Sequence, residues 1–355
     1  MTRHQWTPDR VIDAELAAAV VADQFPDLAG LPVRRFGEGW DNVLYAVGDE
    51  WLFRFIHRSV ALPGARRELA VLTELADSLP LPIPHPVHIG TPTAEVPWPF
   101  WGTRVIPGSE LAEAGLDDDA RVGVARSMGE FLRALHGPEL AESVTAAAEA
   151  AGAPLPVDPM RRADPSHTAA QARETLARLV AAGVGVGASI DADADADADA
   201  YVDDDVCADR AAAAGPGGFV DGGSSVLALP YEALENLLTT AEAVGAPTGR
   251  PVLVHGDLHV RHVLMAPAGE ATGVVDWGDT ALGDPAVDLM LVYAAFAGDA
   301  RAAFFDAYGE VDAATALRAR ALAVRVCTLL LEYALAEQYT ALAAESWACL
   351  CRAVA

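Results

Sequence analysis

The sequence predicts an α+β protein in two parts, a five-stranded antiparallel sheet followed by a larger helical part. Three short runs of β-branched and aromatic residues lie near the N-terminus, separated by glycine-containing turns, as in an antiparallel meander. Two further runs complete the sheet, and beyond residue 107 apolar residues recur at helical spacing. A chain of 355 residues is long enough to bury a core in each part.

The first part opens with an amphipathic pattern over residues 8–25, which predicts a helix. The strands are predicted at residues 31–36, 43–47, 51–56, 87–89 and 99–106. Between the third and fourth strands, the proline-rich residues 79–86 predict a rigid extended connection. The first turn contains Gly37 and Gly39, and a Gly-Glu-Gly hairpin of this kind forms with or without a nucleotide.

The third strand carries one charged residue, Arg54, between Phe53 and Phe55. Because side chains alternate along a strand, Arg54 lies on the opposite face from both rings, among otherwise apolar neighbours. This placement argues against an arginine that is simply exposed to solvent. Glu68, in a helix predicted around residues 64–72, offers Arg54 a bidentate ion pair.

The second part is predicted to be helical. Its helices are expected at residues 118–136, 166–182, 229–245 and 311–354, the last as one or two helices. Gly137 is predicted to cap the first of them, and His136 is predicted to be a core histidine rather than a catalytic base. Residues 184–224 contain an Asp-Ala repeat with almost no large apolar side chains, which predicts a disordered insertion. The repeat lacks the glycine and terminal glutamate of a calcium loop.

Acidic residues follow two buried apolar runs in the second part. Residues 252–254 lead to His255 and Asp257, and residues 274–275 lead to Asp276 and then Asp279. Phosphoryl transfer needs one carboxylate to orient the acceptor hydroxyl, another to hold Mg²⁺, and a second metal contact. A buried aspartate alone often caps a turn, so the pattern depends on the agreement of several spaced elements.

One of these elements is a short apolar strand predicted at residues 263–265, between Asp257 and Asp276. Another is Gly283-Asp-Pro-Ala-Val-Asp-Leu289, which opens a helix. Together these segments resemble the aminoglycoside phosphotransferase family, whose members carry His-Gly-Asp, an asparagine five residues later and then a hydrophobic-Asp segment. The resemblance implies a two-lobed protein-kinase-like fold. Residues 1–105 would form the nucleotide-binding lobe, and residues 106–355 the catalytic and acceptor-binding lobe.

Within this resemblance, Asp257 would be the catalytic aspartate and Asp276 the Mg²⁺ ligand. His262 stands where the family has its asparagine, and would be a second metal contact. This is a departure from the family, because Mg²⁺ prefers oxygen ligands and imidazole suits softer metals. His262 would act directly, through water, or not at all. Asp288 would brace the backbone of the catalytic loop.

The resemblance also implies a site for ATP or GTP. Arg54, in the place of a lysine that this chain lacks, would grip the phosphates and be held by Glu68. Gly37 and Gly39 would cover the phosphates. Backbone groups of Arg104, Val105 and Ile106 would contact the base, although a plain turn from sheet to helix fits this segment equally well.

The implied activity is transfer of a γ-phosphoryl group to a hydroxyl of an aminoglycoside-like acceptor. One alternative is a kinase of another small alcohol, such as a macrolide, a choline-like alcohol or a sugar. Another, suggested by the departures at Arg54 and His262, is a nucleotide-binding module without catalysis. The sequence identifies neither the acceptor nor the oligomeric state.

The net charge is −27, with 24 basic residues that are all arginine. Such a surface repels nucleic acid and anionic membranes and suits a cationic acceptor, although base composition of the gene explains the bias better. The sequence shows neither a signal-peptide pattern nor an apolar run of about 18 residues, which predicts a cytoplasmic protein. The four cysteines follow no metal or disulfide pattern.

Overall fold

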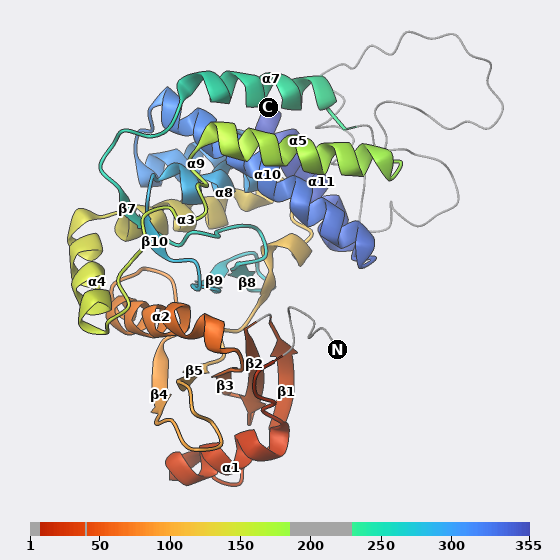
Figure 1. Ribbon diagram of the computed structural model, residues 1–355. Helices are drawn as coiled ribbons and strands as arrows, with labels where there is room; N and C mark the ends of the chain where they lie inside the picture. Colours follow the sequence, from red (N-terminus) through yellow and green to blue (C-terminus); the bar gives the residue numbers. More distant parts are fainter. Residues whose placement is uncertain (1–7, 40, 185–228) are drawn as a thin grey trace, which may run out of the picture.

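The computed structural model describes residues 8–39, 41–184 and 229–355. It consists of two stacked parts, with the sheet at one end and most of the helices at the other (Figure 1). The first part contains α1 (Ala14–Gln24), β1 (Val33–Glu38), β2 (Asn42–Val47), β3 (Trp51–Ile56), α2 (Leu62–Leu75), β4 (Pro86–Gly90) and β5 (Phe100–Arg104). Residues 185–224 of the predicted insertion lie outside the described residues.

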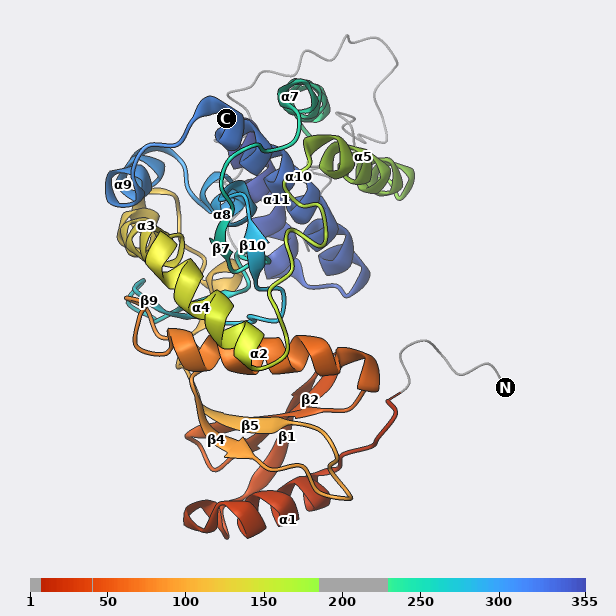
Figure 2. The same ribbon diagram turned by 60° about the vertical axis from the view of Figure 1, so that its left-hand side comes forward.

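The five strands form one antiparallel sheet in the order β1-β2-β3-β5-β4, as the sequence predicts. Helix α1 covers one face and α2 the other, and α2 lies between the sheet and the helical part (Figures 1 and 2). The α1 face is closed by aromatic side chains that include Phe53 and Phe55, both fully buried. Alternation along β3 therefore turns Arg54 toward α2.

Helix α1 is shorter than the predicted helix over residues 8–25. It begins at Ala14 because Asp13 acts as its N-cap, with the Asp13 carboxylate accepting the Leu16 N–H at 2.8 Å. The residues before Asp13 are therefore outside the helix, although Ile12 still contributes to the buried core.

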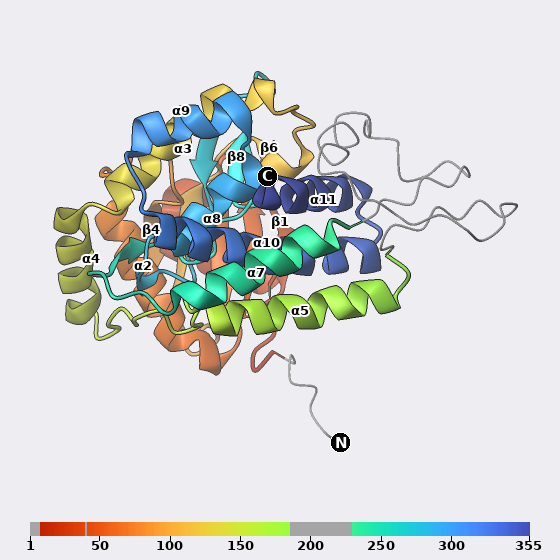
Figure 3. The ribbon, with the colours of Figure 1, turned by 90° about the horizontal axis from the view of Figure 1, so that it is seen from above.

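The second part contains a core of packed helices and two small sheets. Its helices are α3 (Val122–Leu135), α4 (Pro138–Ala150), α5 (Pro165–Ala181), α7 (Tyr231–Val244), α8 (Ala286–Ala295), α9 (Gly298–Tyr308), α10 (Ala313–Ala336) and α11 (Thr340–Val354). All 10 residues of α8 are buried, so this helix forms the centre of the core. Helix α10 packs against α5, α7, α8 and α11, which lie beside it in the view from above (Figure 3).

One detail of the helical part differs from the sequence prediction, and one predicted alternative is resolved. Gly137 does not cap α3 in the left-handed conformation, because its φ is −62° and Pro138 starts α4 directly after it. His136 is instead the C-cap of α3. The predicted segment 311–354 forms two helices, α10 and α11, and Gln338, at φ 59°, lies between them.

The two small sheets place the candidate site residues. Strands β6 (Ser109–Glu110), β8 (Val263–Met265) and β9 (Ala271–Val274) form one, and β7 (Val252–Val254) pairs with β10 (Ala281–Gly283) in the other. The segment after β9 lies against the sheet part, because a Cβ on Gly278 would lie 4.0 Å from Glu68 Oε2 of α2. Gly256, after β7, approaches the same segment at Asp279. Every helix in the described ranges is too short or too polar to span a membrane.

Candidate active site

His255, at the end of β7, holds the turn that leads to Asp257. Its ring is fully buried, and Nε2 lies 3.0 Å from the carbonyl oxygen of Val275. A carbonyl can only accept, so Nε2 carries the proton, and Nδ1 accepts the N–H of Asp257 at 3.3 Å. Burial lowers the pKa of His255, which keeps the ring neutral. His255 is therefore a structural member of the site.

Gly256 makes the turn possible. Its φ is 94°, and a Cβ at this position would lie 2.2 Å from the carbonyl oxygen of Asp279. Any side chain would be strained and would push the two loops apart. The glycine of the His-Gly-Asp motif is thus required by the close approach of the segments that carry Asp257 and Asp279.

Asp288, on α8, braces the same turn as predicted. Its carboxylate accepts the backbone N–H groups of His255 at 2.8 Å and Gly256 at 3.0 Å. His136 Nε2 lies 3.2 Å from it, and His136 Nδ1 lies 2.8 Å from the Tyr308 hydroxyl. Burial raises the pKa of Asp288, but the His136 hydrogen bond and charge and the Gly256 N–H outweigh burial, so the pKa is lowered. His136 is a buried core histidine, which confirms its predicted role.

Asp288→Ala is expected to lower the free energy of unfolding by about 3–5 kcal/mol, because it leaves buried donors without an acceptor. Urea unfolding measures this loss, and the exposed Asp306→Ala on α9 is the control, expected to change stability by less than about 0.5 kcal/mol.

A folded-state pKa of Asp288 below the ordinary 3.8 means that its ionised carboxylate stabilises the protein above pH 3.8. The stability that the ionised carboxylate contributes is lost as the pH falls through the lowered pKa of Asp288. Equal stability of the two variants would contradict the bracing role.

Asp257 is held by a residue that sequence reasoning missed, Arg162. Arg162 Nη2 lies 3.2 Å from Asp257 Oδ1 and 2.7 Å from Asp279 Oδ2, and Nη1 donates to the Gly256 carbonyl oxygen at 2.6 Å. The arginine side chain is only 12% exposed. Burial lowers the pKa of Arg162, but Asp257 and Asp279 outweigh it and raise the pKa above its ordinary value. Arg162 therefore fixes the orientation of Asp257 while leaving Oδ2 without an arginine contact.

The loop between α4 and α5 delivers Arg162. Asp158 Oδ1 accepts the N–H of Arg162 at 2.8 Å, and Asp158 Oδ2 accepts the N–H of Ala163 at 3.0 Å. Asp158 and Arg161 both have positive φ, 33° and 51°. This strained loop brings Arg162 next to residues about 95 positions later. The sequence contains no periodic pattern that signals such a contact.

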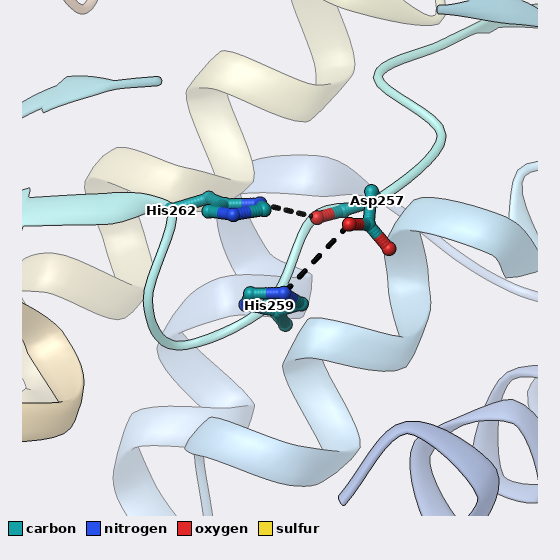
Figure 4. A group of neighbouring side chains, drawn as sticks. All are labelled: Asp257, His259 and His262. Atoms are coloured by element: carbon teal, nitrogen blue, oxygen red, sulfur yellow. Dashed lines mark hydrogen bonds and ion pairs between the residues drawn. The ribbon is translucent and has the colours of Figure 1, made fainter. Parts of the chain in front are cut away.

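His262 joins the catalytic loop to Asp276. Its Nδ1 lies 2.7 Å from the carbonyl oxygen of Asp257 (Figure 4), and its Nε2 lies 3.5 Å from Asp276 Oδ2. Asp276 has φ 68°, a conformation that aspartate tolerates better than most residues, and its side chain is 56% exposed. Partial desolvation raises the pKa of Asp276, but His262 and Arg54 outweigh it and lower the pKa. The carboxylate is thus ionised and accessible, as a metal ligand must be.

A second imidazole, His259, also lies against Asp257. Its Nε2 is 3.8 Å from Asp257 Oδ2, and its ring centroid is 3.9 Å from that of His262 (Figure 4). Burial, followed by the neighbouring His262, lowers the pKa of His259 well below its ordinary value. The sequence places His259 two residues after Asp257, but only the folded loop shows its contact with both residues.

Arg54 and Glu68 form the predicted ion pair. Arg54 Nη1 lies 2.6 Å from both carboxylate oxygens of Glu68, and the Glu68 side chain is 7% exposed. The pair faces the acidic loop of the second part, because a Cβ on Gly278 would lie 4.0 Å from Glu68 Oε2 and 3.9 Å from Asp276 Oδ1. Burial raises the pKa of Glu68, and Arg54 opposes this. The structure therefore brings Arg54, Glu68 and Asp276 close together.

The predicted phosphate loop and hinge lie at the edge of this arrangement. Gly37 falls at an irregularity in the β1–β2 pairing, and the Gly39 N–H donates to the Asn42 carbonyl oxygen at 2.9 Å. In the hinge, the Val105 N–H donates to the Glu50 carbonyl oxygen at 2.8 Å, so this N–H already has an acceptor in the sheet part.

The side chain of Arg104, in the predicted hinge, does not turn toward Asp257 and Asp276. It is 64% exposed and pairs with Glu50 at 2.7 Å. Ile106 packs near Gly273 of β9. Base contacts at the hinge would therefore use backbone groups other than the Val105 N–H.

A family model described as the phosphotransferase enzyme family (APH) matches residues 32–323. Solved structures share the fold at low sequence identity. The GDP complex of wild-type aminoglycoside 2'-phosphotransferase-IIIa is 21% identical, with a TM-score of 0.56 over 96% of this chain and 97% of that chain. The GDP and kanamycin complex of APH(2")-IIia is 22% identical, with a TM-score of 0.54 over 93% of this chain and 95% of that chain.

Two further comparisons extend this result. The apoenzyme of macrolide 2'-phosphotransferase MphH from Brachybacterium faecium is 22% identical, with a TM-score of 0.51 over 95% of this chain and 97% of that chain. The uncharacterized protein YcbJ of Bacillus subtilis (strain 168) is 36% identical over 58 residues, which is 16% of this chain and 19% of YcbJ. The match thus spans about a fifth of this curated relative. The solved structures confirm the predicted two-lobed kinase-like fold.

Proposed function

The chain belongs to the phosphotransferase enzyme family, and from this premise we propose that it is a small-molecule kinase. It transfers the γ-phosphoryl group of ATP or GTP to a hydroxyl group of a small acceptor. One observation carries this proposal: His262 contacts the backbone carbonyl of Asp257 through Nδ1 and the Asp276 carboxylate through Nε2, and the Arg54–Glu68 pair lies beside the loop that carries Asp276. The arrangement has separate groups for the acceptor, the metal and the phosphates.

In this proposal, residues 1–105 bind the nucleotide. Arg54 contacts the phosphates and Glu68 fixes its guanidinium, as their 2.6 Å contact supports. Gly37 and Gly39 lie in the loop that covers the phosphates, and Gly37 leaves open space on its Cα. Backbone groups from Arg104 to Ile106 contact the base.

Residues 106–355 carry out the transfer and bind the acceptor. Asp257 accepts a hydrogen bond from the acceptor hydroxyl and orients its oxygen toward the phosphorus atom. Arg162 positions that carboxylate, and His255 and Asp288 fix the backbone beneath it. Such catalysis depends mainly on orientation and on charge stabilisation.

Asp276 is the residue that fits Mg²⁺ best, because its ionised carboxylate is an oxygen ligand and is accessible. When bound there, Mg²⁺ would neutralise phosphate charge. His262 offers nitrogen, which Mg²⁺ binds poorly, so His262 serves this metal through water or by holding the Asp257 backbone.

The proposed acceptor is aminoglycoside-like, and a cationic one suits the net charge of −27. The likeness to an aminoglycoside kinase bound to kanamycin and to a macrolide kinase supports a polyhydroxylated acceptor in general. A macrolide, a choline-like alcohol or a sugar is the alternative. Measuring ATP and GTP consumption with Mg²⁺ across these acceptor classes tests the proposal. Acceptor-dependent consumption supports it, and nucleotide binding without consumption would favour a non-catalytic module.

His262→Asn and His262→Ala separate the two roles of this side chain. If His262 assists the metal, His262→Asn retains turnover, because an amide oxygen serves Mg²⁺ at least as well as imidazole, and His262→Ala loses it. If His262 only holds the Asp257 carbonyl, both variants lose about 0.5–1.5 kcal/mol of stability and turnover falls less. Turnover in Mg²⁺ and Mn²⁺, together with melting temperature, distinguishes these outcomes. Wild-type turnover in His262→Ala would place the second metal contact elsewhere.

A further inference from the structure

The catalytic loop gathers three metal-ligating side chains in one place. Asp257, His259 and His262 each offer one ligand atom, and these atoms lie within 4.8 Å of one another. Figure 4 shows the two imidazole rings one above the other beside the carboxylate. The His259 and His262 side chains are 12% and 14% exposed, so both rings are already fixed by packing and would lose little freedom on binding a ligand.

The hydrogen bonds of His262 prepare it as a ligand. Nδ1 lies 2.7 Å from the Asp257 carbonyl oxygen, which can only accept, so Nδ1 carries a proton. In the neutral ring Nε2 then has the lone pair, and Nε2 also lies 3.5 Å from Asp276 Oδ2. Metal-binding histidines usually donate their second N–H to a carbonyl or carboxylate in this way. His259 needs a proton shift, because its Nδ1 accepts the Arg261 N–H at 3.3 Å. On metal binding through Nε2, the proton moves to Nδ1 and that long hydrogen bond is lost.

The donor set selects a different metal from Mg²⁺. Two imidazoles and one carboxylate match Zn²⁺ and similar borderline cations, and three protein ligands plus one open position is a common zinc arrangement. With zinc–ligand bonds of about 2.0 Å, tetrahedral ligands lie about 3.3 Å apart. The side chains therefore have to close by roughly an ångström or more. Asp257 is the most exposed member, with a side chain that is 32% exposed, and its Oδ2, which Arg162 does not contact, is the oxygen left for a cation.

We propose that Asp257, His259 and His262 form a binding site for Zn²⁺-like cations that inhibits the protein. The site uses a different carboxylate from the Mg²⁺ site proposed at Asp276, and His262 lies next to both. A cation bound here occupies the carboxylate that would orient the acceptor and draws His262 away from Asp276. Zn²⁺ should then compete with the acceptor rather than with the nucleotide. The inhibition rests on the proposed function, whereas the binding does not.

Binding is tested on the full chain without nucleotide. Co²⁺ serves as a spectroscopic probe for the Zn²⁺ site, and calorimetry gives the Zn²⁺ affinity. We expect one Co²⁺ per chain with the intense visible absorption of tetrahedral Co²⁺, displaced by Zn²⁺. His259→Ala and, independently, His262→Asn should each weaken the affinity at least about tenfold. His85→Ala, an exposed histidine on the linker before β4, is the matched control and should bind as wild type does.

Melting temperatures show whether each variant is folded. If His259→Ala is not folded, His262→Asn still tests the site. Affinity that is unchanged in both folded variants, or no binding by wild type, would overturn the site. In the activity assay with Mg²⁺, His259→Ala should need at least about tenfold more Zn²⁺ for half-inhibition, each protein being compared with its own rate without Zn²⁺. Unchanged inhibition there would overturn the inhibitory role. If the protein has no kinase activity, the Co²⁺ spectrum still decides the binding, so the two failures are distinguishable.

Discussion

Asp257→Asn is expected to lower turnover by about 10²- to 10⁴-fold while nucleotide affinity stays within a few-fold of wild type. The carboxylate would contact the acceptor hydroxyl, and no described contact joins it to the Arg54–Glu68 pair that would bind the phosphates. Asparagine has nearly the same shape and keeps an oxygen that accepts from Arg162 Nη2. The loss is therefore expected in turnover and not in folding.

Turnover at saturating nucleotide and acceptor, nucleotide affinity and melting temperature should be measured together. Asp306→Asn on the exposed face of α9 is the control and should match wild type in all three. Wild-type turnover in Asp257→Asn would remove Asp257 from the mechanism. A joint loss of turnover and nucleotide affinity would place Asp257 at the nucleotide instead.

Asp276→Asn is expected to abolish the rise in melting temperature that Mg²⁺ and nucleotide give to wild type. A ligand at 100 times its Kd stabilises a protein by about 2.7 kcal/mol, which for a chain of this size is a shift of roughly 3–5 °C. Asparagine tolerates the positive φ of 68° at this position, so the variant removes the charge without adding backbone strain.

Asp279→Asn is the matched control, because Asp279 lies on the same loop and pairs with Arg162 rather than with His262. It should keep the Mg²⁺-dependent shift. If Asp279→Asn lost the shift and Asp276→Asn retained it, Asp279 would be the metal ligand. The measurement is a thermal scan with nucleotide, with and without Mg²⁺.

Much of the fold could be predicted because its signals are local. Alternation along β3 placed Arg54 away from Phe53 and Phe55, and the Arg54–Glu68 contact at 2.6 Å confirms the predicted pair. The brace from Asp288 to the catalytic loop also followed from the motif resemblance. Strands β6 and β10 were missed, because neither contains the β-branched residues that marked the equally short strands β7 and β8.

Parts of the site could not be predicted because they depend on tertiary contacts. Arg162 reaches Asp257 from a loop shaped by the Asp158 carboxylate and by positive φ angles, features with no periodic signature. His259 and His262 are close in sequence, but their 3.9 Å ring contact depends on how the loop folds back. A glycine directly after a predicted helix usually caps it in the left-handed conformation. Pro138 starts a new helix directly after Gly137, so Gly137 adopts a different conformation.

The central claim is that this site transfers a phosphoryl group to a small hydroxyl compound. The most direct measurement is mass spectrometry of the acceptor after incubation with Mg²⁺ and ATP or GTP carrying ¹⁸O on the γ-phosphate. The account predicts a labelled phosphate on a hydroxyl of at least one aminoglycoside, macrolide, amino alcohol or sugar with wild type, and about 10²- to 10⁴-fold less with Asp257→Asn. Mg²⁺-dependent nucleotide binding with no labelled acceptor, or equal labelling by both proteins, would contradict it.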